Sequence, residues 1–79
     1  LVMERYKNLG GNSGIMAYEI DDQSITVEFE DGSVYIYTYG SAGAENIERM
    51  KKLAIAGEGL NSFINTTASV RKGYKQKFR

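Results

Sequence analysis

Two runs of alternating apolar and polar residues, 24–30 and 33–39, flank the dipeptide Asp31-Gly32. Alternation at a period of two is typical of half-buried strands, and an Asp-Gly pair is a common turn between two such strands. The pattern therefore predicts a β-hairpin. Its second strand carries a tyrosine at every second position, namely Tyr35, Tyr37 and Tyr39.

The length of the hairpin loop decides which face these tyrosines occupy. A two-residue loop pairs Val27 with Ile36 and leaves the tyrosines on the opposite face. A three-residue loop, with Gly32 in the left-handed position of a bulge, pairs Val27 with Tyr35 instead, because a one-residue slip exchanges the two faces. We favour the three-residue loop since tyrosine buries more area than valine. Val34 and Ile36 then lie on the face away from the core.

A further strand is predicted over residues 15–20, ahead of the hairpin. Its alternate positions Met16, Tyr18 and Ile20 are apolar and are expected to share one face. Residues 21–23, Asp-Asp-Gln, then turn the chain, because Asp side chains bond nearby backbone N–H groups. Together with the hairpin, this strand makes a three-stranded antiparallel meander.

Two helices are predicted after the meander. The first spans residues 42–56, with Ser41 as its N-cap and Gly57 just beyond its end. The second spans residues 60–68. Each presents an apolar stripe at helical spacing, formed by Ile47, Met50, Leu53, Ala54, Leu60, Phe63, Ile64 and Thr67. The predicted fold class is α+β, a three-stranded antiparallel β-meander packed on one face by two C-terminal helices.

The chain has 79 residues, which is enough for one domain. We expect an N-terminal leader over 1–13, the α+β domain over 14–68 and a basic C-terminal tail over 69–79. In the leader, Tyr6 and Leu9 are expected to pack back onto the domain. The expected core comprises Ile25, Val27, Phe29, Tyr35, Tyr37, Ile47, Met50, Leu53, Phe63 and Ile64.

Histidine and cysteine are absent from the sequence. The commonest general base and metal ligand are therefore missing, and neither disulfides nor thiolate sites can form. Glu28 and Glu30 share a strand face, but a small sheet offers a carboxylate pair little cleft for catalysis. We expect no enzyme, and hence no catalytic residues, cofactor, metal site or small-molecule substrate.

The same composition bears on location. The lack of cysteine fits a reducing compartment, so we expect a cytoplasmic protein. No apolar run approaches the roughly 20 residues that cross a bilayer, so we expect no membrane contact.

The net charge is zero but unevenly distributed. Residues 19–31 contain six acids and no base, whereas residues 59–79 contain five bases and no acid. Tyr74 and Phe78 are interleaved with these bases, a pattern that suits phosphate contacts and base stacking. The candidate nucleic-acid-binding residues are Arg71, Lys72, Tyr74, Lys75, Lys77 and Arg79.

One spacing in the hairpin, V-x-F-x-x-G-x-x-Y-x-Y, resembles that of the KTSC family, small domains named for similarity to the C-terminal part of a lysyl-tRNA synthetase. The matching residues are Val27, Phe29, Gly32, Tyr35 and Tyr37. The likeness covers about residues 13–67, from the S-x-I-x-x-x-Y pattern of the first strand to the segment GEGLNSFI. The resemblance implies this fold, no established catalytic residues, and a hint of RNA association.

Two functions are consistent with these observations. The first is a small non-enzymatic protein-interaction or self-association module, since a small sheet leaves open edges and an uncovered face. Val34 and Ile36 form its candidate protein-contact face. The alternative is RNA or single-stranded nucleic-acid binding through the basic C-terminal tail. We favour the protein contact because the acidic hairpin repels phosphate and nucleic-acid-binding domains are usually basic.

Overall fold

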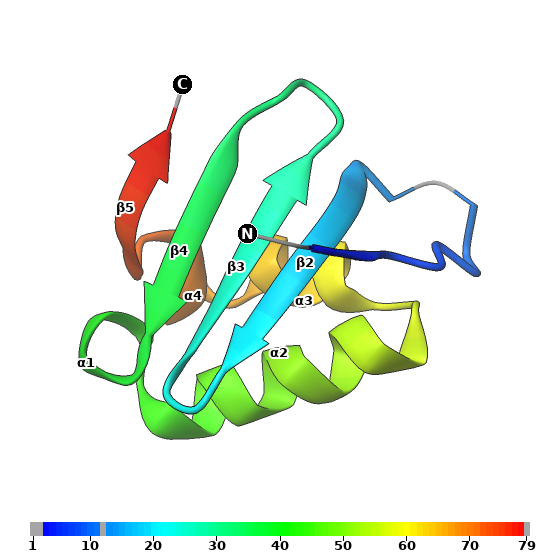
Figure 1. Ribbon diagram of the computed structural model, residues 1–79. Helices are drawn as coiled ribbons and strands as arrows, with labels where there is room; N and C mark the ends of the chain where they lie inside the picture. The colour runs from blue at the N-terminus through cyan, green and yellow to red at the C-terminus, as the bar shows by residue number, and fades with distance from the viewer. Residues whose placement is uncertain (1–2, 12, 79) are drawn as a thin grey trace.

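The computed structural model describes residues 3–11 and 13–78, which form a five-stranded antiparallel sheet and four helices. The strands, which lie side by side in chain order (Figure 1), are β1 (Glu4–Arg5), β2 (Ile15–Asp21), β3 (Ser24–Phe29), β4 (Val34–Thr38) and β5 (Tyr74–Phe78). The helices are α1 (Tyr39–Ala42), α2 (Ala44–Ala56), α3 (Leu60–Thr66) and α4 (Ala68–Arg71). The α+β class is confirmed, but the prediction of three strands and two helices is wrong.

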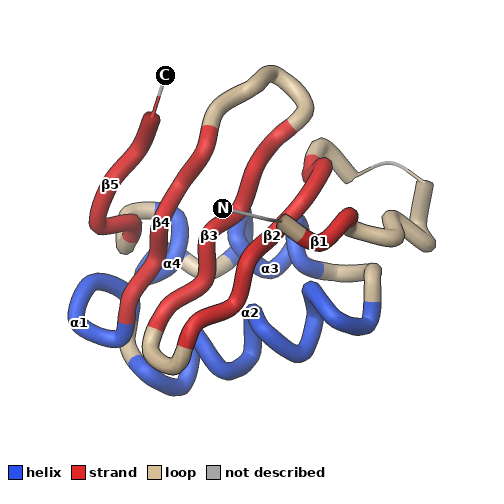
Figure 2. The backbone as a smooth tube through the Cα atoms, in the orientation of Figure 1, coloured by secondary structure: helices blue, strands red, loops and turns tan. Residues whose placement is uncertain are grey.

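The molecule has two layers. Helices α2, α3 and α4 lie behind the sheet in the view of Figure 1, and α1 is a single turn at the end of β4. Figure 2 shows the strands in front, with no described helix covering their near side. The core therefore sits between one face of the sheet and the helices, and the other face is uncovered.

The hairpin has the register of the three-residue loop. Val27 is paired with Tyr35, as that loop requires. Gly32 has a φ of 91°, a left-handed conformation that glycine adopts without strain. Because cross-strand partners share a face, the tyrosines lie on the helix side. There Tyr37 is 1% exposed, and Tyr35 and Tyr39 pack partly buried against the core.

The core-facing side of β2 differs from the prediction at Met16, which is 46% exposed. The pairing of β2 with β3 shifts at a β-bulge between Ile15 and Ala17. Ile15 consequently enters the core with 2% exposure, while Tyr18 and Ile20 pack against the core as predicted. Alternation alone places Met16 wrongly because a bulge adds one residue to one strand of the pair.

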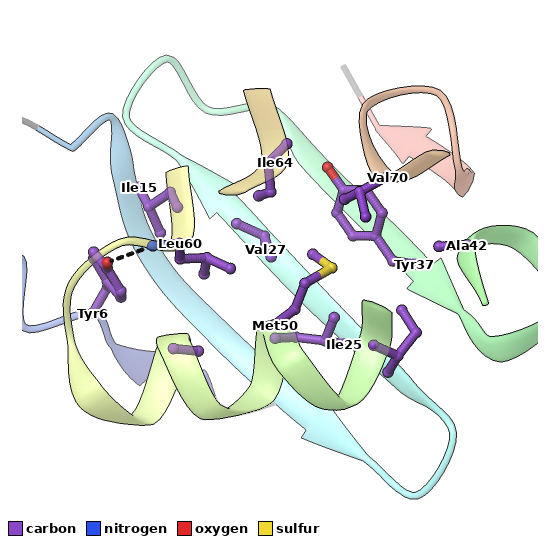
Figure 3. Close-up of a cluster of buried hydrophobic side chains, with 12 residues drawn as sticks. Tyr6, Ile15, Ile25, Val27, Tyr37, Ala42, Met50, Leu60, Ile64 and Val70 are labelled. Carbon is purple, nitrogen blue, oxygen red and sulfur yellow. Dashed lines mark hydrogen bonds between the residues drawn. The ribbon is translucent and has the colours of Figure 1, made fainter. Parts of the chain in front are cut away.

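The N-terminal segment supplies one edge strand. β1 pairs with β2, and Tyr6 directly after it is 3% exposed. The Tyr6 hydroxyl accepts a hydrogen bond from the backbone N–H of Leu60 at 3.3 Å (Figure 3). Leu9 was expected to pack back too, but its side chain is 64% exposed. Only its backbone N–H contacts the domain, donating to the carbonyl of Gly57 at 2.7 Å.

The basic C-terminal segment supplies the other edge strand. β5 pairs antiparallel with β4, with Phe78 opposite Val34 and Tyr74 opposite Tyr37. Gly73 leads into this strand and is buried. A Cβ atom at Gly73 would lie 2.1 Å from a backbone oxygen of α4, so only glycine allows this close approach.

The helical layer is divided more finely than predicted. Gly43, with φ 96° and ψ 138°, interrupts the expected long helix and separates α1 from α2. Ser41 is not the N-cap of the long helix, because its side chain and that of Thr38 form a capping box on α1. Thr67 is extended and separates α3 from α4. Gly57 ends α2 in a left-handed conformation, as predicted.

The core combines sheet, helices and the N-terminal segment (Figure 3). The predicted core residues that are buried are Ile25, Val27, Tyr37, Ile47, Met50 and Ile64. Those that pack against the core while partly exposed are Phe29, Tyr35, Leu53 and Phe63. Its further buried members are Tyr6, Ile15, Ala42, Ala54, Leu60 and Val70. Burying each large side chain contributes about 1.5–3 kcal/mol, so both terminal segments add to stability.

Candidate functional site

The uncovered face of the sheet has an apolar centre. The register places Val34 beside Phe78, and Ile36 beside Thr26, on the side away from the helices. Together with Met3, these residues line an open hollow of about 450 Å³. Phe78 is 50% exposed, whereas Thr26, in the central strand, is 7% exposed. The hollow is thus a shallow apolar surface with an exposed ring at one side.

Both residues of the predicted contact face, Val34 and Ile36, lie on this surface. Sequence reasoning missed Met3 and Phe78. Met3 lies beside β1 and Phe78 in β5, and both reach the hollow only through strand pairing between distant segments. The aromatic character of Phe78 was visible in the sequence, but its face was not.

Charges of opposite sign lie toward the two edges of the sheet. The acidic residues Glu19 and Asp21 belong to β2 and line the hollow. The exposed bases Lys75 and Lys77 belong to β5, beyond β3 and β4 in the sheet, and Lys77 is paired with Tyr35 on the helix side. No ion pair joins the two groups within residues 3–11 and 13–78. The sheet therefore presents one acidic and one basic margin.

The predicted nucleic-acid-binding residues are spread over two elements. Arg71 ends α4 and Lys72 follows it, whereas Tyr74, Lys75 and Lys77 lie in β5. Arg79 lies outside the described residues. The described members are all exposed, but the two aromatic residues interleaved with the bases lie on opposite faces of the sheet. Tyr74 and Lys77 are paired with the core-facing tyrosines of β4, while Phe78 is on the uncovered face.

The tyrosines of β4 offer little ring surface to a nucleic-acid base. Tyr35 makes edge contacts with Phe29 and Tyr74, at ring-centroid distances of 5.4 and 4.9 Å. It also stacks with Tyr37 at 6.2 Å, and the Nζ atom of Lys77 lies 5.3 Å from its centroid. Base stacking needs an accessible ring face. The ring of Tyr35 is already used in contacts within the protein.

A polar network ties the turn between β2 and β3 to helix α2. The Tyr39 hydroxyl donates to the Glu48 carboxylate at 2.5 Å. Lys51 Nζ donates to the same carboxylate at 2.9 Å and to the Asp22 carbonyl at 2.8 Å. The hydrogen bond from Tyr39 is the main cause that lowers the pKa of Glu48, and the same bond raises the pKa of Tyr39. The network stabilises the turn and presents no activated nucleophile.

Comparisons with family models, with curated proteins and with solved structures find no match for this chain. The resemblance to the KTSC family therefore stays a prediction. Within the described ranges, no cluster of three or more potential metal-ligating side chains occurs, and no helix has the length and apolar character that a bilayer span requires.

Proposed function

We propose that this protein is a small non-enzymatic contact module that associates with a second copy of itself through the uncovered face of its sheet. The observation that carries the proposal is the apolar hollow around Val34, Ile36 and Phe78, on the side that no described helix covers. On a domain of this size, an uncovered apolar face is typical of an association surface. Packing a second layer on it would remove the half-exposed ring of Phe78 from water.

The charge distribution supports a second copy as the partner. The net charge is zero, so two copies do not repel each other strongly. In such a dimer the uncovered faces of the two sheets meet, and the two-fold axis runs between them, parallel to the strands. This symmetry places β2 of one copy over β5 of the other. The acidic residues of β2 then lie opposite the basic strand β5 in both halves of the contact. Sheets packed face to face in this way lie about 10 Å apart.

Sedimentation equilibrium over a concentration series tests this proposal. The unaltered chain is expected to dimerise, and Ile36→Glu is expected to remain a monomer, because the core of an interface is depleted of charge. Ile55→Glu is the matched control, since Ile55 is 59% exposed and lies on α2, away from the contact. Thermal melts show whether both variants are folded. A strict monomer at the highest concentration would refute self-association.

Single-stranded nucleic-acid binding is a second candidate, favoured by one observation. The exposed bases of α4 and β5 have no acidic partner within residues 3–11 and 13–78. The hint of RNA association from the KTSC resemblance points the same way. It is less well supported than self-association, because Tyr35 is covered by its neighbours and the acidic residues of β2 and β3 repel phosphate.

A further inference from the structure

A smaller cavity, of about 220 Å³, lies on the helix side of the sheet. It opens between the loop that joins β3 to β4 and the corner that joins α3 to α4. Phe29, Tyr35 and Ile64 form its apolar walls. Sites for drug-sized ligands usually exceed about 300 Å³, so this cavity suits one side chain rather than a cofactor.

Tyr37 also lines this cavity, and its hydroxyl has no hydrogen-bond partner among the described residues. Tyr37 is 1% exposed. In the described part of the chain, every side-chain oxygen or nitrogen that is fully shielded from solvent has a hydrogen-bond partner, so the unpartnered hydroxyl of Tyr37 cannot be fully shielded. The small exposed part of Tyr37 is therefore its hydroxyl. Figure 3 shows the ring between Ile64 and Val70, with the hydroxyl pointing away from Met50. A hydroxyl at a cavity wall that has no partner within the protein can donate a hydrogen bond to an entering group.

The polar groups around the Tyr37 hydroxyl are suited to donate hydrogen bonds. Burial raises the pKa of Tyr37, so the hydroxyl keeps its proton near neutral pH. Arg71 lines the same cavity and uses Nη1 for a long contact of 3.5 Å with the carbonyl of Asn65, which leaves its other N–H groups available. Asp31 also lines the cavity, but its carboxylate accepts from the N–H and the hydroxyl of Ser33, at 2.9 and 2.6 Å.

The helix-corner and β5 side of the cavity is basic, whereas the loop between β3 and β4 on its other side carries the acids Glu30 and Asp31. Residues 59–78 contain four bases and no acid, and three of these bases are Arg71, Lys72 and Lys77. The Nζ atom of Lys77 lies 5.3 Å from the ring centroid of Tyr35, which is one of the cavity walls. The basic side attracts a negatively charged group and repels a positive one.

We propose that this cavity binds a Glu or Asp side chain from an acidic segment of a partner protein. The carboxylate accepts hydrogen bonds from the Tyr37 hydroxyl and from the guanidinium of Arg71, and a bond to the guanidinium is charge-assisted. The aliphatic stem packs against Phe29 and Ile64. The site lies on the opposite side of the sheet from the self-association face, so it goes beyond the proposed function and does not depend on it.

The test is a titration of a fluorescein-labelled, acetylated and amidated Glu-Ser repeat peptide with the full chain, followed by fluorescence anisotropy. Tyr37→Phe removes only the hydroxyl and is expected to weaken binding about fivefold, the loss expected for one hydrogen bond. Its melting temperature should stay the same or rise, because the lost hydroxyl had no partner. Arg71→Gln is expected to weaken binding about tenfold or more. Lys52→Gln, on the exposed side of α2, is the matched charge control, with a change of less than about twofold.

A Gln-Ser repeat peptide of equal length carries no carboxylates and is expected not to bind. Absence of Glu-Ser binding, equal binding of the two peptides, or unchanged affinity of Tyr37→Phe would each overturn the proposal. So would tighter, Tyr37-dependent binding of a single-stranded RNA oligomer. The two proposals can fail separately, since a protein that is monomeric in the centrifuge but binds the peptide refutes only self-association.

Discussion

The N-terminal segment is attached to the core by the ring of Tyr6, and removing that ring tests whether the segment is an integral part of the fold. Tyr6 is 3% exposed, and its hydroxyl accepts the backbone N–H of Leu60 at 3.3 Å. Tyr6→Ala removes the ring together with the acceptor. Tyr6→Phe removes the acceptor alone, so the pair of variants separates packing from hydrogen bonding.

The expected losses follow from the burial of Tyr6. Removing a buried aromatic ring costs about 3–5 kcal/mol, and losing one hydrogen bond costs about 1 kcal/mol. A chain of 79 residues has a free energy of unfolding of roughly 4–12 kcal/mol. Tyr6→Ala therefore removes a large part of the stability. Tyr6→Phe is expected to lower the melting temperature by about 4–8 °C.

Thermal and urea unfolding, followed by circular dichroism, measure both changes. Leu9→Ala is the matched control, because Leu9 belongs to the same segment and is 64% exposed. Its truncation is expected to change the free energy of unfolding by less than about 0.5 kcal/mol. If Tyr6→Ala and Leu9→Ala melt at the same temperature, the argument that the N-terminal segment completes the core is refuted.

Three further predictions concern single positions and the basic strand. Gly73→Ala places a Cβ atom 2.1 Å from a backbone oxygen of α4, so urea unfolding should show that the free energy of unfolding falls by about 3 kcal/mol. Gly40→Ala is the control, because a Cβ atom there lies 3.9 Å from its nearest neighbour and should be tolerated. Tyr39→Phe removes the donor that lowers the pKa of Glu48, so an NMR titration should move that pKa back toward 4.5. Because the folded state lowers the pKa of Glu48, the stability that this shift contributes is present above pH 4.5 and is lost as the pH falls below that value. An unchanged Glu48 titration in the variant would contradict the assigned hydrogen bond. Fluorescent single-stranded RNA, titrated at low and moderate salt, tests the nucleic-acid alternative, which requires binding that weakens steeply with salt.

The candidate sites were predictable only in part. Val34 and Ile36 could be assigned to the outward face because the register of a tight hairpin depends on a few neighbouring residues. Phe78 joins them only because β5 pairs with β4. The hydroxyl of Tyr37 faces a cavity only because the corner between α3 and α4 leaves it uncovered. Neither arrangement can be predicted from the pattern of neighbouring residues in the sequence.

The sequence by itself determined the α+β class, the β3–β4 register and the end of α2 at Gly57, because these features depend on periodicity and on turn residues a few positions apart. Only the tertiary structure decided the two edge strands and the bulge near Met16. The segment 74–78, YKQKF, has no apolar stripe of its own, and it becomes a strand because β4 offers unpaired backbone groups along its edge. The N-terminal segment is held in the same non-local way, by a ring that enters a core built from distant parts of the chain.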